Sequence, residues 1–204
     1  MASEHYFTND PSTELKPRQI TVQLSGREYT LTTSGGVFSP DHIDDGTAVL
    51  LDNVPAPPQT GDLLDIGSGW GPIALTMAIE APDATVWAVD VNDRALELVR
   101  RNAAAIGVTN INAVRPEDVP EGITFSTIWS NPPIRIGKVE LHTLLQSWMP
   151  RLAPDSEAWL VVQKNLGADS LHRWMNEEFP GLEIVREAVG MGYRVLKATS
   201  ARAD

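Results

Sequence analysis

The sequence predicts an α/β fold in which helices cover both faces of a mostly parallel sheet. From residue 61 onward, short apolar runs alternate with stretches that carry apolar residues at helical spacing, the order expected of parallel strands joined by helices. The first of these runs ends in a glycine-rich turn. Earlier residues show a different pattern of short alternating strands. We therefore expect an amino-terminal extension over residues 1–60, packed on a main domain over residues 61–204.

The extension is expected to contain a β-hairpin and one short helix. Residues 19–24 (QITVQL) and 27–33 (REYTLTT) alternate polar and apolar side chains on either side of a Ser-Gly turn, which predicts a hairpin. A glycine-rich loop, a helix over residues 44–54 and a proline-rich linker follow.

The main domain is expected to alternate strands and helices along the chain. Helical spacing of apolar residues predicts helices at 72–81, 93–107, 138–149 and 168–179. Short apolar runs predict strands at 62–67, 85–91, 110–114, 125–130, 157–163, 182–190 and 193–200. Crossovers between parallel strands should be right-handed, as chain chirality favours.

Composition excludes several classes of protein. The 204 residues are 42% hydrophobic and 21% charged, as in an ordinary globular protein with one sizeable core. Without cysteine there is neither a disulfide nor a thiolate zinc site, so we expect a cytoplasmic protein. No signal-peptide-like or membrane-spanning run is visible, and the four histidines lack metal-ligand spacing, so we expect no membrane and no metal. A net charge of −11 argues against broad nonspecific binding of nucleic acid.

The glycine-rich turn over residues 65–71 predicts a nucleotide-type site for a cationic ligand. Its spacing is G-x-G-x-G, and Pro72 stands where a dinucleotide fingerprint requires a third glycine, which disfavours a nicotinamide cofactor. Asp65 would repel a pyrophosphate but attract a sulfonium that carries an ammonium group. Asp90 ends the second strand of the main domain, where a carboxylate can bind both ribose hydroxyls. Asp118, after the third strand, is either a partner for an adenine amino group or a solvated loop acid.

A second candidate site follows the strand over residues 125–130, at Asn131-Pro132-Pro133-Ile134. One interpretation is a turn that ends the strand, because proline fixes φ and restricts the residue before it. The other is an acceptor site, because consecutive prolines leave carbonyl oxygens free of nearby backbone donors beside an amide. The Asn131 oxygen and the Pro132 carbonyl would then accept both hydrogens of an exocyclic NH2, orient its lone pair and stabilise the developing positive charge.

Taken together, these motifs resemble class I S-adenosylmethionine-dependent methyltransferases of the small-domain family, and are similar to the ribosomal RNA guanine-N2 enzymes. The matching segments are HYFTNDP, TSGGVFSPDHIDDGTAVLL, LLDIGSGWGPIAL, VDVNDRALELVRRNA, SNPPIRIGK, WLVVQKNLGA and GYRVLKA. The resemblance implies a Rossmann-like fold. It also implies a site for S-adenosylmethionine formed by Asp65, Gly67, Ser68, Gly69, Asp90, Val91, Asp118 and Asn131. Asn131 through Ile134 would lie at the target amine.

The sequence departs from the wider amino-methyltransferase pattern at Ile134, where an aromatic residue often stacks on the flat target. Phe38 is our candidate for a replacement stacking residue, although a core position suits it equally. Arg135, Lys138 and Lys164 form either a phosphate-contacting lip or ordinary surface charges. Family members that modify small-subunit RNA can carry a further amino-terminal domain, whereas here a short segment precedes the hairpin.

The expected function is methyl transfer from S-adenosylmethionine to an exocyclic amine of a nucleobase, with guanine N2 in ribosomal RNA as the leading target. The partner would be ribosomal RNA or the small ribosomal subunit. Methylation of a protein glutamine amide at N5 is a second interpretation, and a noncatalytic S-adenosylmethionine-binding module associated with RNA is a third. The sequence leaves open the nucleotide, the free or assembled state of the RNA, and the oligomeric state.

Overall fold

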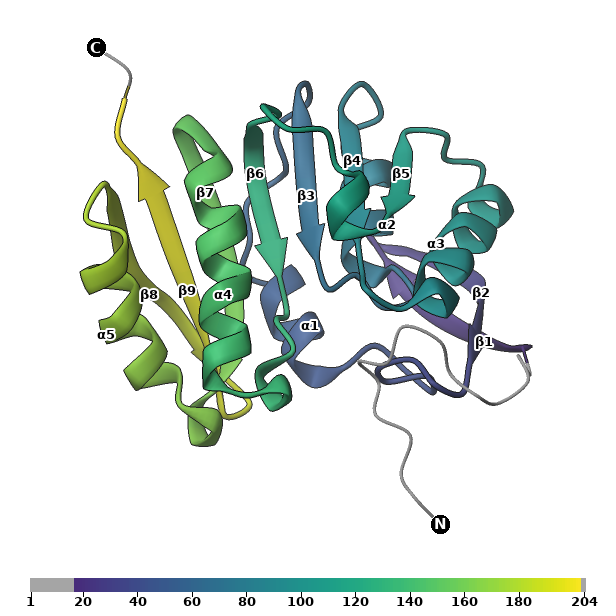
Figure 1. The fold of residues 1–204 in the computed structure, drawn as a ribbon. Helices are drawn as coiled ribbons and strands as arrows, with labels where there is room; N and C mark the ends of the chain where they lie inside the picture. Colours follow the sequence, from purple (N-terminus) through teal and green to yellow (C-terminus); the bar gives the residue numbers. More distant parts are fainter. Residues whose placement is uncertain (1–16, 203–204) are drawn as a thin grey trace.

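A computed structural model of the chain describes residues 17–202 and contains one seven-stranded sheet beside a two-stranded hairpin (Figure 1). The strands of the large sheet lie in the order β5-β4-β3-β6-β7-β9-β8. Their bounds are β3 Asp62–Ile66, β4 Thr85–Val89, β5 Ile111–Val114, β6 Phe125–Ser130, β7 Leu152–Gln163, β8 Leu182–Gly190 and β9 Tyr193–Ser200. Strands β3 to β7 pair in parallel, and β9 is antiparallel to both of its neighbours. The predicted mostly parallel α/β sheet with an antiparallel carboxyl-terminal strand is confirmed.

The helices lie close to their predicted positions. Their bounds are α1 Asp45–Leu51, α2 Pro72–Glu80, α3 Asp93–Ile106, α4 Lys138–Trp148 and α5 Ala168–Glu178. Short 3-10 turns add η1 Pro116–Asp118, η2 Ile134–Ile136, η3 Met149–Arg151 and η4 Lys164–Leu166. The main difference from prediction is β7, which begins at Leu152 instead of residue 157, because Leu152 already pairs with Phe125 before an irregularity in the register.

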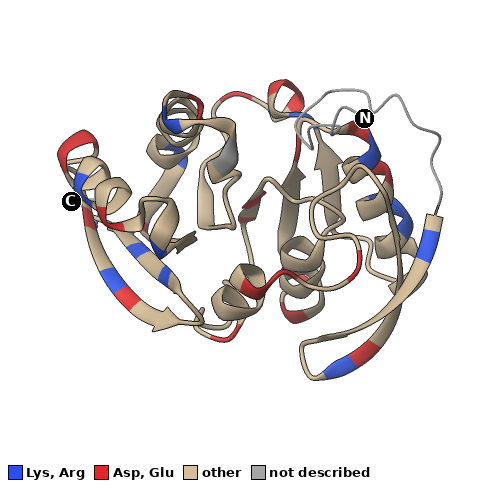
Figure 2. Cartoon of the chain, turned by 90° about the horizontal axis from the view of Figure 1, so that it is seen from below, with Lys and Arg blue, Asp and Glu red and all other residues tan. Residues whose placement is uncertain are grey.

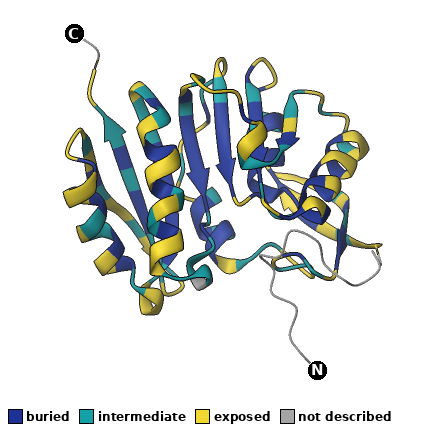
Figure 3. Ribbon diagram, in the orientation of Figure 1, coloured by how far each residue is buried: buried dark blue, intermediate teal, exposed yellow. Residues whose placement is uncertain are grey.

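Two apolar layers enclose the large sheet. One layer packs α1, α2 and α3 against strand residues that include Trp129, Trp159 and Val161. The opposite layer packs α4 and α5 against Phe125, Ile128 and their neighbours. Figure 3 shows the central strands buried between these layers. Within residues 17–202, no helix is long and apolar enough to cross a membrane.

The amino-terminal hairpin, β1 Pro17–Leu24 and β2 Arg27–Ser34, packs beside α2 and α3. Leu24 and Leu31 share a buried cluster with Leu75 of α2 and Leu98 of α3. The amide of Asn102 on α3 bonds both the N–H and the carbonyl of Thr32, at 2.7 and 3.0 Å. The hairpin is thus fixed to the helices that follow the first two parallel strands.

The loop after β2 is held against the start of α3. The Arg94 guanidinium donates to the Gly35 carbonyl, and the Asn92 amide donates to the Gly36 carbonyl, each at 2.8 Å. Trp70 donates from its indole nitrogen to the Ser39 carbonyl at 3.0 Å. These bonds place Val37 and Phe38 beside the carboxyl ends of the parallel strands, at the lower edge of the sheet in Figure 1.

Candidate active site

A cavity of about 420 Å³ opens at the carboxyl ends of the parallel strands. Parallel α/β sheets generally bind ligands at this edge. Strand ends and the glycine loop line it, together with the loop after β2, the start of α1 and the facing ends of β7 and β9. The segment after β6, the helices α3 and α4, and the η1 and η4 turns contribute the rest. Figure 2 looks onto this edge and shows no broad basic face among the described residues.

The glycine-rich loop forms the floor of this cavity. The N–H groups of Gly67 and Ser68 both donate to the Val89 carbonyl, at 2.8 and 3.0 Å, which bends the chain sharply after β3. Gly69 has φ of 55°, and a Cβ placed there would meet no atom within 4 Å. The left-handed conformation favours glycine, and the open space above it lets a ligand approach the backbone.

Asp90, at the end of β4, fixes this loop from the side. One carboxylate oxygen accepts from the Gly69 N–H and the other from the Asn92 N–H, each at 2.9 Å. Burial raises the pKa of Asp90, and the backbone N–H bonds oppose that rise. A carboxylate has about four acceptor positions, more than these N–H groups use, so it can still accept a hydroxyl group from a ligand in the cavity.

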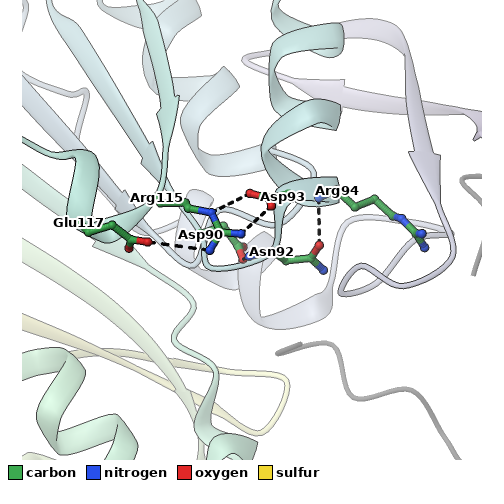
Figure 4. A network of polar contacts seen from close by, with 6 residues as sticks. All are labelled: Asp90, Asn92, Asp93, Arg94, Arg115 and Glu117. Atoms are coloured by element: carbon green, nitrogen blue, oxygen red, sulfur yellow. Dashed lines mark hydrogen bonds and ion pairs between the residues drawn. The ribbon is translucent and has the colours of Figure 1, made fainter. Parts of the chain in front are cut away.

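Polar contacts around Asp90 join β4, α3 and the turn after β5 (Figure 4). Asn92 caps α3 by accepting from the Arg94 N–H at 3.0 Å. Arg115 makes a bidentate ion pair with Asp93, and its guanidinium lowers the pKa of that carboxyl. Arg115 Nη1 also lies 3.9 Å from Glu117 Oε1. Exposed ion pairs add little stability, so we treat these as contacts between the start of α3 and the turn after β5 and not as a source of folding energy.

The Asn131 side chain is oriented by two residues at the start of α1. Its Nδ2 donates to Asp44 Oδ2 at 2.9 Å and to Thr47 Oγ1 at 3.0 Å. A carboxylate only accepts hydrogen bonds, so the NH2 side of the amide must face Asp44. Both amide hydrogens are therefore used, and Oδ1 accepts no hydrogen bond from the described residues. Asn131 also lines the cavity, so the amide can offer this oxygen to a donor there.

The sequence predicts that the carbonyl oxygens of the two prolines are free of nearby backbone donors. This prediction is wrong, because both oxygens accept a local backbone N–H. Pro133 has φ of −73° and ψ of 72°, an inverse γ-turn that brings the Ile134 N–H to 2.8 Å from the Pro132 carbonyl. The Pro133 carbonyl accepts from the Ile136 N–H at 3.1 Å. Each carbonyl oxygen has two lone pairs, so Pro132 keeps one for a ligand.

The glycine loop and the Asn-Pro-Pro segment face each other. A Cβ on Gly67 would lie 3.5 Å from Cδ of Pro133, which is ordinary van der Waals contact. The same cavity is lined by Gly67 and Gly69 on one side and by residues 131–134 on the other. The arrangement therefore pairs a nucleotide-type loop with a site of hydrogen-bond acceptors.

Residues 28–197 match the family model described as Methyltransferase small domain. The chain belongs to this methyltransferase family. It is 35% identical over 199 residues to the uncharacterised protein YbxB of Bacillus subtilis, a match that covers 96% of this chain and 98% of that protein. S-adenosylmethionine is accordingly its methyl donor.

Ribosomal RNA methyltransferases are also among the relatives of this methyltransferase. It is 36% identical over 148 residues to Ribosomal RNA small subunit methyltransferase C of Aeromonas hydrophila, which covers 70% of this chain but only 42% of that protein. The chain thus spans less than half the length of that relative. Its fold is similar to that of the T. thermophilus 16S rRNA N2 G1207 methyltransferase (RsmC) in complex with AdoMet and guanosine, with TM-score 0.77 and 24% identity over 93% of this chain and 52% of that one.

The methyltransferase cavity fits S-adenosylmethionine. Its volume lies within the roughly 300–1,000 Å³ of small-molecule sites, and Val91 and Val37 give it apolar walls. Asp65 and Ser68 do not line it but are buried beside the loop, and Asp65 Oδ1 and Ser68 Oγ have no hydrogen-bond partner among the described residues. Neither atom reaches the cavity, so a negative charge on Asp65 would attract a cationic ligand over the loop from a distance and not by direct contact.

Asp65 is more deeply buried than a ligand-facing carboxylate. Its Oδ2 accepts from the Ala74 N–H of α2 at 3.0 Å. Burial raises the pKa of Asp65 well above its ordinary value, the Ala74 bond lowers it in part, and the charge of Asp90 adds to the rise. Its influence on a ligand would pass through the protein interior, where charges are weakly screened.

The other predicted site residues differ in how close they lie to the cavity. Phe38 is 45% exposed and lines the cavity, so the core position considered for it is not the one observed. Asp118 is exposed and does not line the cavity, although Pro116 of the same turn does. Lys138 and Lys164 are exposed at the starts of α4 and η4. The Arg135 side chain and the HYFTNDP motif lie outside the described residues.

Among the side chains of the site that sequence reasoning missed, four polar ones matter most for the proposed chemistry. Asp44 and Thr47 orient Asn131, whereas Gln163 and Tyr193 line the cavity from β7 and β9. An acidic residue before a predicted helix signals an N-cap, and Asp44 does cap α1 through the N–H groups of Gly46 and Thr47. No local signal could have shown that the same carboxylate bonds a residue 87 positions away.

Proposed function

We propose that this methyltransferase transfers a methyl group from S-adenosylmethionine to an exocyclic amine of a nucleobase, namely guanine N2 in ribosomal RNA. The observation that carries this proposal is the Asn131 amide, whose hydrogens are both bonded by Asp44 and Thr47. Its remaining oxygen is an acceptor in the cavity that also contains the glycine loop. Relatives that act on small-subunit ribosomal RNA support the choice of a nucleobase over other amines.

The residues of this chain act on the amine through orientation. S-adenosylmethionine supplies a methyl group already activated on a sulfonium, so no covalent intermediate with the protein is needed. An arylamine nitrogen is a poor nucleophile because its lone pair is delocalised into the ring. Asn131 Oδ1 and the remaining lone pair of Pro132 O accept its two hydrogens, which directs the nitrogen lone pair toward the methyl group. The same oxygens stabilise the positive charge that develops on nitrogen.

Phe38 and Ile134 are the proposed surfaces for the flat face of the base. Both line the cavity, and Phe38 is exposed enough to stack on an aromatic ligand. Lys138 and Lys164 lie exposed at the same edge of the sheet, where they can contact RNA phosphates. The proposed partner is therefore ribosomal RNA, free or in the small subunit.

The test combines mapping of the product with one substitution. Ribosomal RNA from a strain that lacks the gene is incubated with purified protein and labelled S-adenosylmethionine, and modified nucleosides are identified by mass spectrometry. We expect N2-methylguanosine. Asn131→Ala should lower kcat by about a hundredfold or more, while calorimetry finds little change in S-adenosylmethionine affinity. Methylation of a protein glutamine in place of RNA, or full turnover by the variant, would contradict the proposal.

A further inference from the structure

Gln163 presents to the cavity an amide that makes no hydrogen bond with the described part of the chain. It is the last residue of β7 and stands before the η4 turn, where its side chain makes no capping hydrogen bond. It is half-buried and lines the same cavity as Asn131. Within residues 17–202, no hydrogen bond to its side-chain oxygen or nitrogen is present. A half-buried amide loses hydration, so an unused donor and acceptor pair beside a ligand cavity favours a polar ligand.

The register of the sheet places Gln163 opposite the Asn-Pro-Pro segment. Ser130, the last residue of β6, pairs with Leu160 of β7. Beyond this pair, β7 continues to Gln163 while the β6 chain turns at residues 131–134. Gln163 is thus three residues past the last pair, roughly 10 Å at the usual rise of a strand, and it borders the space over that turn.

The side chain of Gln163 shares a face of the sheet with α1. Trp159 and Val161 of β7 belong to the apolar layer that contains α1. Side chains alternate along a strand, so Gln163 lies on that face too. Its cross-strand partner Tyr193 also lines the cavity and packs against Gly46 of α1. The Asn131 amide is bonded to the start of the same helix, so both amides lie on the α1 side.

We propose that Gln163 is the specificity-determining residue that reads the guanine edge next to the methylated amine. This inference rests on the proposed function. Along its Watson–Crick edge, guanine presents the N2 amine, the N1–H donor and the O6 acceptor. Asn131 Oδ1 accepts from the amine, Gln163 Oε1 accepts from N1–H, and Gln163 Nε2 donates to O6. A side-chain amide pairs with two adjacent base atoms in the same bidentate manner when proteins read bases in duplex DNA.

The test uses a base that keeps the amine and loses its neighbours. In an oligoribonucleotide carrying the mapped site, 2-aminopurine replaces the target guanine, which retains the 2-amino group but has neither N1–H nor O6. Two hydrogen bonds of ordinary strength correspond to about a 30-fold difference in kcat/KM. For each protein, the preference is the ratio of kcat/KM for guanine to kcat/KM for 2-aminopurine. We expect this ratio to be about 30-fold larger for wild type than for Gln163→Ala. The intrinsic reactivity of the two bases cancels because the same pair is compared in both proteins.

Asn165→Ala is the matched control, since Asn165 is an exposed amide of the same η4 turn that does not line the cavity. It should keep the wild-type preference. Gln163→Glu should accept from N1–H but repel O6, so guanine should become a poorer substrate than with wild type. An unchanged preference in Gln163→Ala, with guanine still methylated, would overturn the role of Gln163 and leave the proposed function standing. If wild type methylates neither base although it still binds S-adenosylmethionine, the proposed function fails and this inference fails with it.

Discussion

The Asp44 carboxylate both caps α1 and orients the Asn131 amide. Its Oδ2 accepts from the Gly46 and Thr47 N–H groups, which caps α1, and from Nδ2 of Asn131. The first task stabilises a helix, whereas the second determines which end of the Asn131 amide faces the cavity. Because the cap and the amide share an oxygen, the direction of α1 and the orientation of the proposed acceptor are fixed together.

Replacing Asp44 with Asn separates these tasks. Asparagine caps helices as well as aspartate does, but it carries no charge and can turn its own NH2 toward Asn131. We expect kcat to fall about tenfold, because the loss of a charge-assisted hydrogen bond of roughly 1.5 kcal/mol loosens the amide. Circular dichroism and S-adenosylmethionine affinity should stay close to wild type. Asp45→Asn removes the same charge one residue later without contacting Asn131, and an equal loss of kcat there would contradict this role.

Asp65 gives stability a pH dependence. Burial raises its pKa well above the ordinary 3.8. The stability that the neutral carboxyl provides is therefore fully present below that ordinary pKa and is lost as pH rises through the raised, folded-state pKa. Asp65→Asn keeps an oxygen for the Ala74 N–H and carries no charge. We expect the variant to be more stable than wild type at pH 7 and to lose this advantage as the pH falls toward 4.

Urea unfolding across this range measures the effect, and an advantage independent of pH would contradict it. At a pH above the raised pKa of Asp65, the same variant should bind S-adenosylmethionine more weakly, because the negative charge that wild type carries beside the glycine loop is gone. Stability and ligand affinity would then change in opposite directions, as is common where a functional site retains a destabilising group.

At the scale of the elements, α1 is the short helix that backs the proposed acceptor site. It spans residues 45–51, too few for stable helix formation in isolation, so packing and its cap hold it in place. Gly46 lies where the helix passes Tyr193. A Cβ there would be 2.7 Å from Cε1 of Tyr193 and 2.9 Å from Asp44 Oδ2.

Gly46→Ala should therefore disturb the site even though alanine is the better helix former. Alanine in place of glycine favours a helix by up to about 1 kcal/mol, yet here the methyl group must displace the Tyr193 ring or the Asp44 carboxylate. We expect kcat/KM to fall about tenfold or more while thermal stability changes little. Ala48→Gly on the same helix is the control and should show the reverse, with lower stability and retained activity. Wild-type kcat/KM in Gly46→Ala would show that this contact does not matter.

At the scale of the whole molecule, the amino-terminal extension before residue 61 completes the cavity. No residue of the hairpin itself lines the cavity, but the loop that follows it contributes Val37 and Phe38 to the cavity wall. Asn102 ties the hairpin to the Rossmann-like domain through the two Thr32 bonds. Its amide also donates to the Trp70 carbonyl, within that domain, at 3.1 Å. We infer that residues before 61 form part of the methyltransferase site.

Asn102→Ala tests this coupling. Losing three buried hydrogen bonds should cost about 3 kcal/mol of unfolding free energy and lower S-adenosylmethionine affinity about tenfold, because the loop over the cavity loses its anchor. Asn110→Ala is the matched control, since its amide also bonds three carbonyls, those of Ala78, Ala81 and Ala84, away from the cavity. The control should lose stability with unchanged affinity. If both variants bind S-adenosylmethionine with the same affinity, the hairpin does not support the site.

The sequence by itself determined the sheet, the order of helices and the two segments that carry the proposed chemistry. Helical and strand periodicity depends on which face of each element is buried, and that pattern is local, so most element ends were predicted within a few residues. The glycine loop and the Asn-Pro-Pro segment were equally readable, because their backbone demands restrict residue type at each position.

Only the tertiary structure decided how side chains from distant segments meet. The bonds from Asn131 to Asp44 and Thr47, the burial of Asp65 below the loop and the place of Gln163 beside the cavity all depend on sheet register and helix packing. The γ-turn at Pro133, which supplied the Pro132 carbonyl with a donor, arises from a ψ angle that proline does not fix. Such contacts join residues far apart in the chain, and no local pattern of residues encodes them.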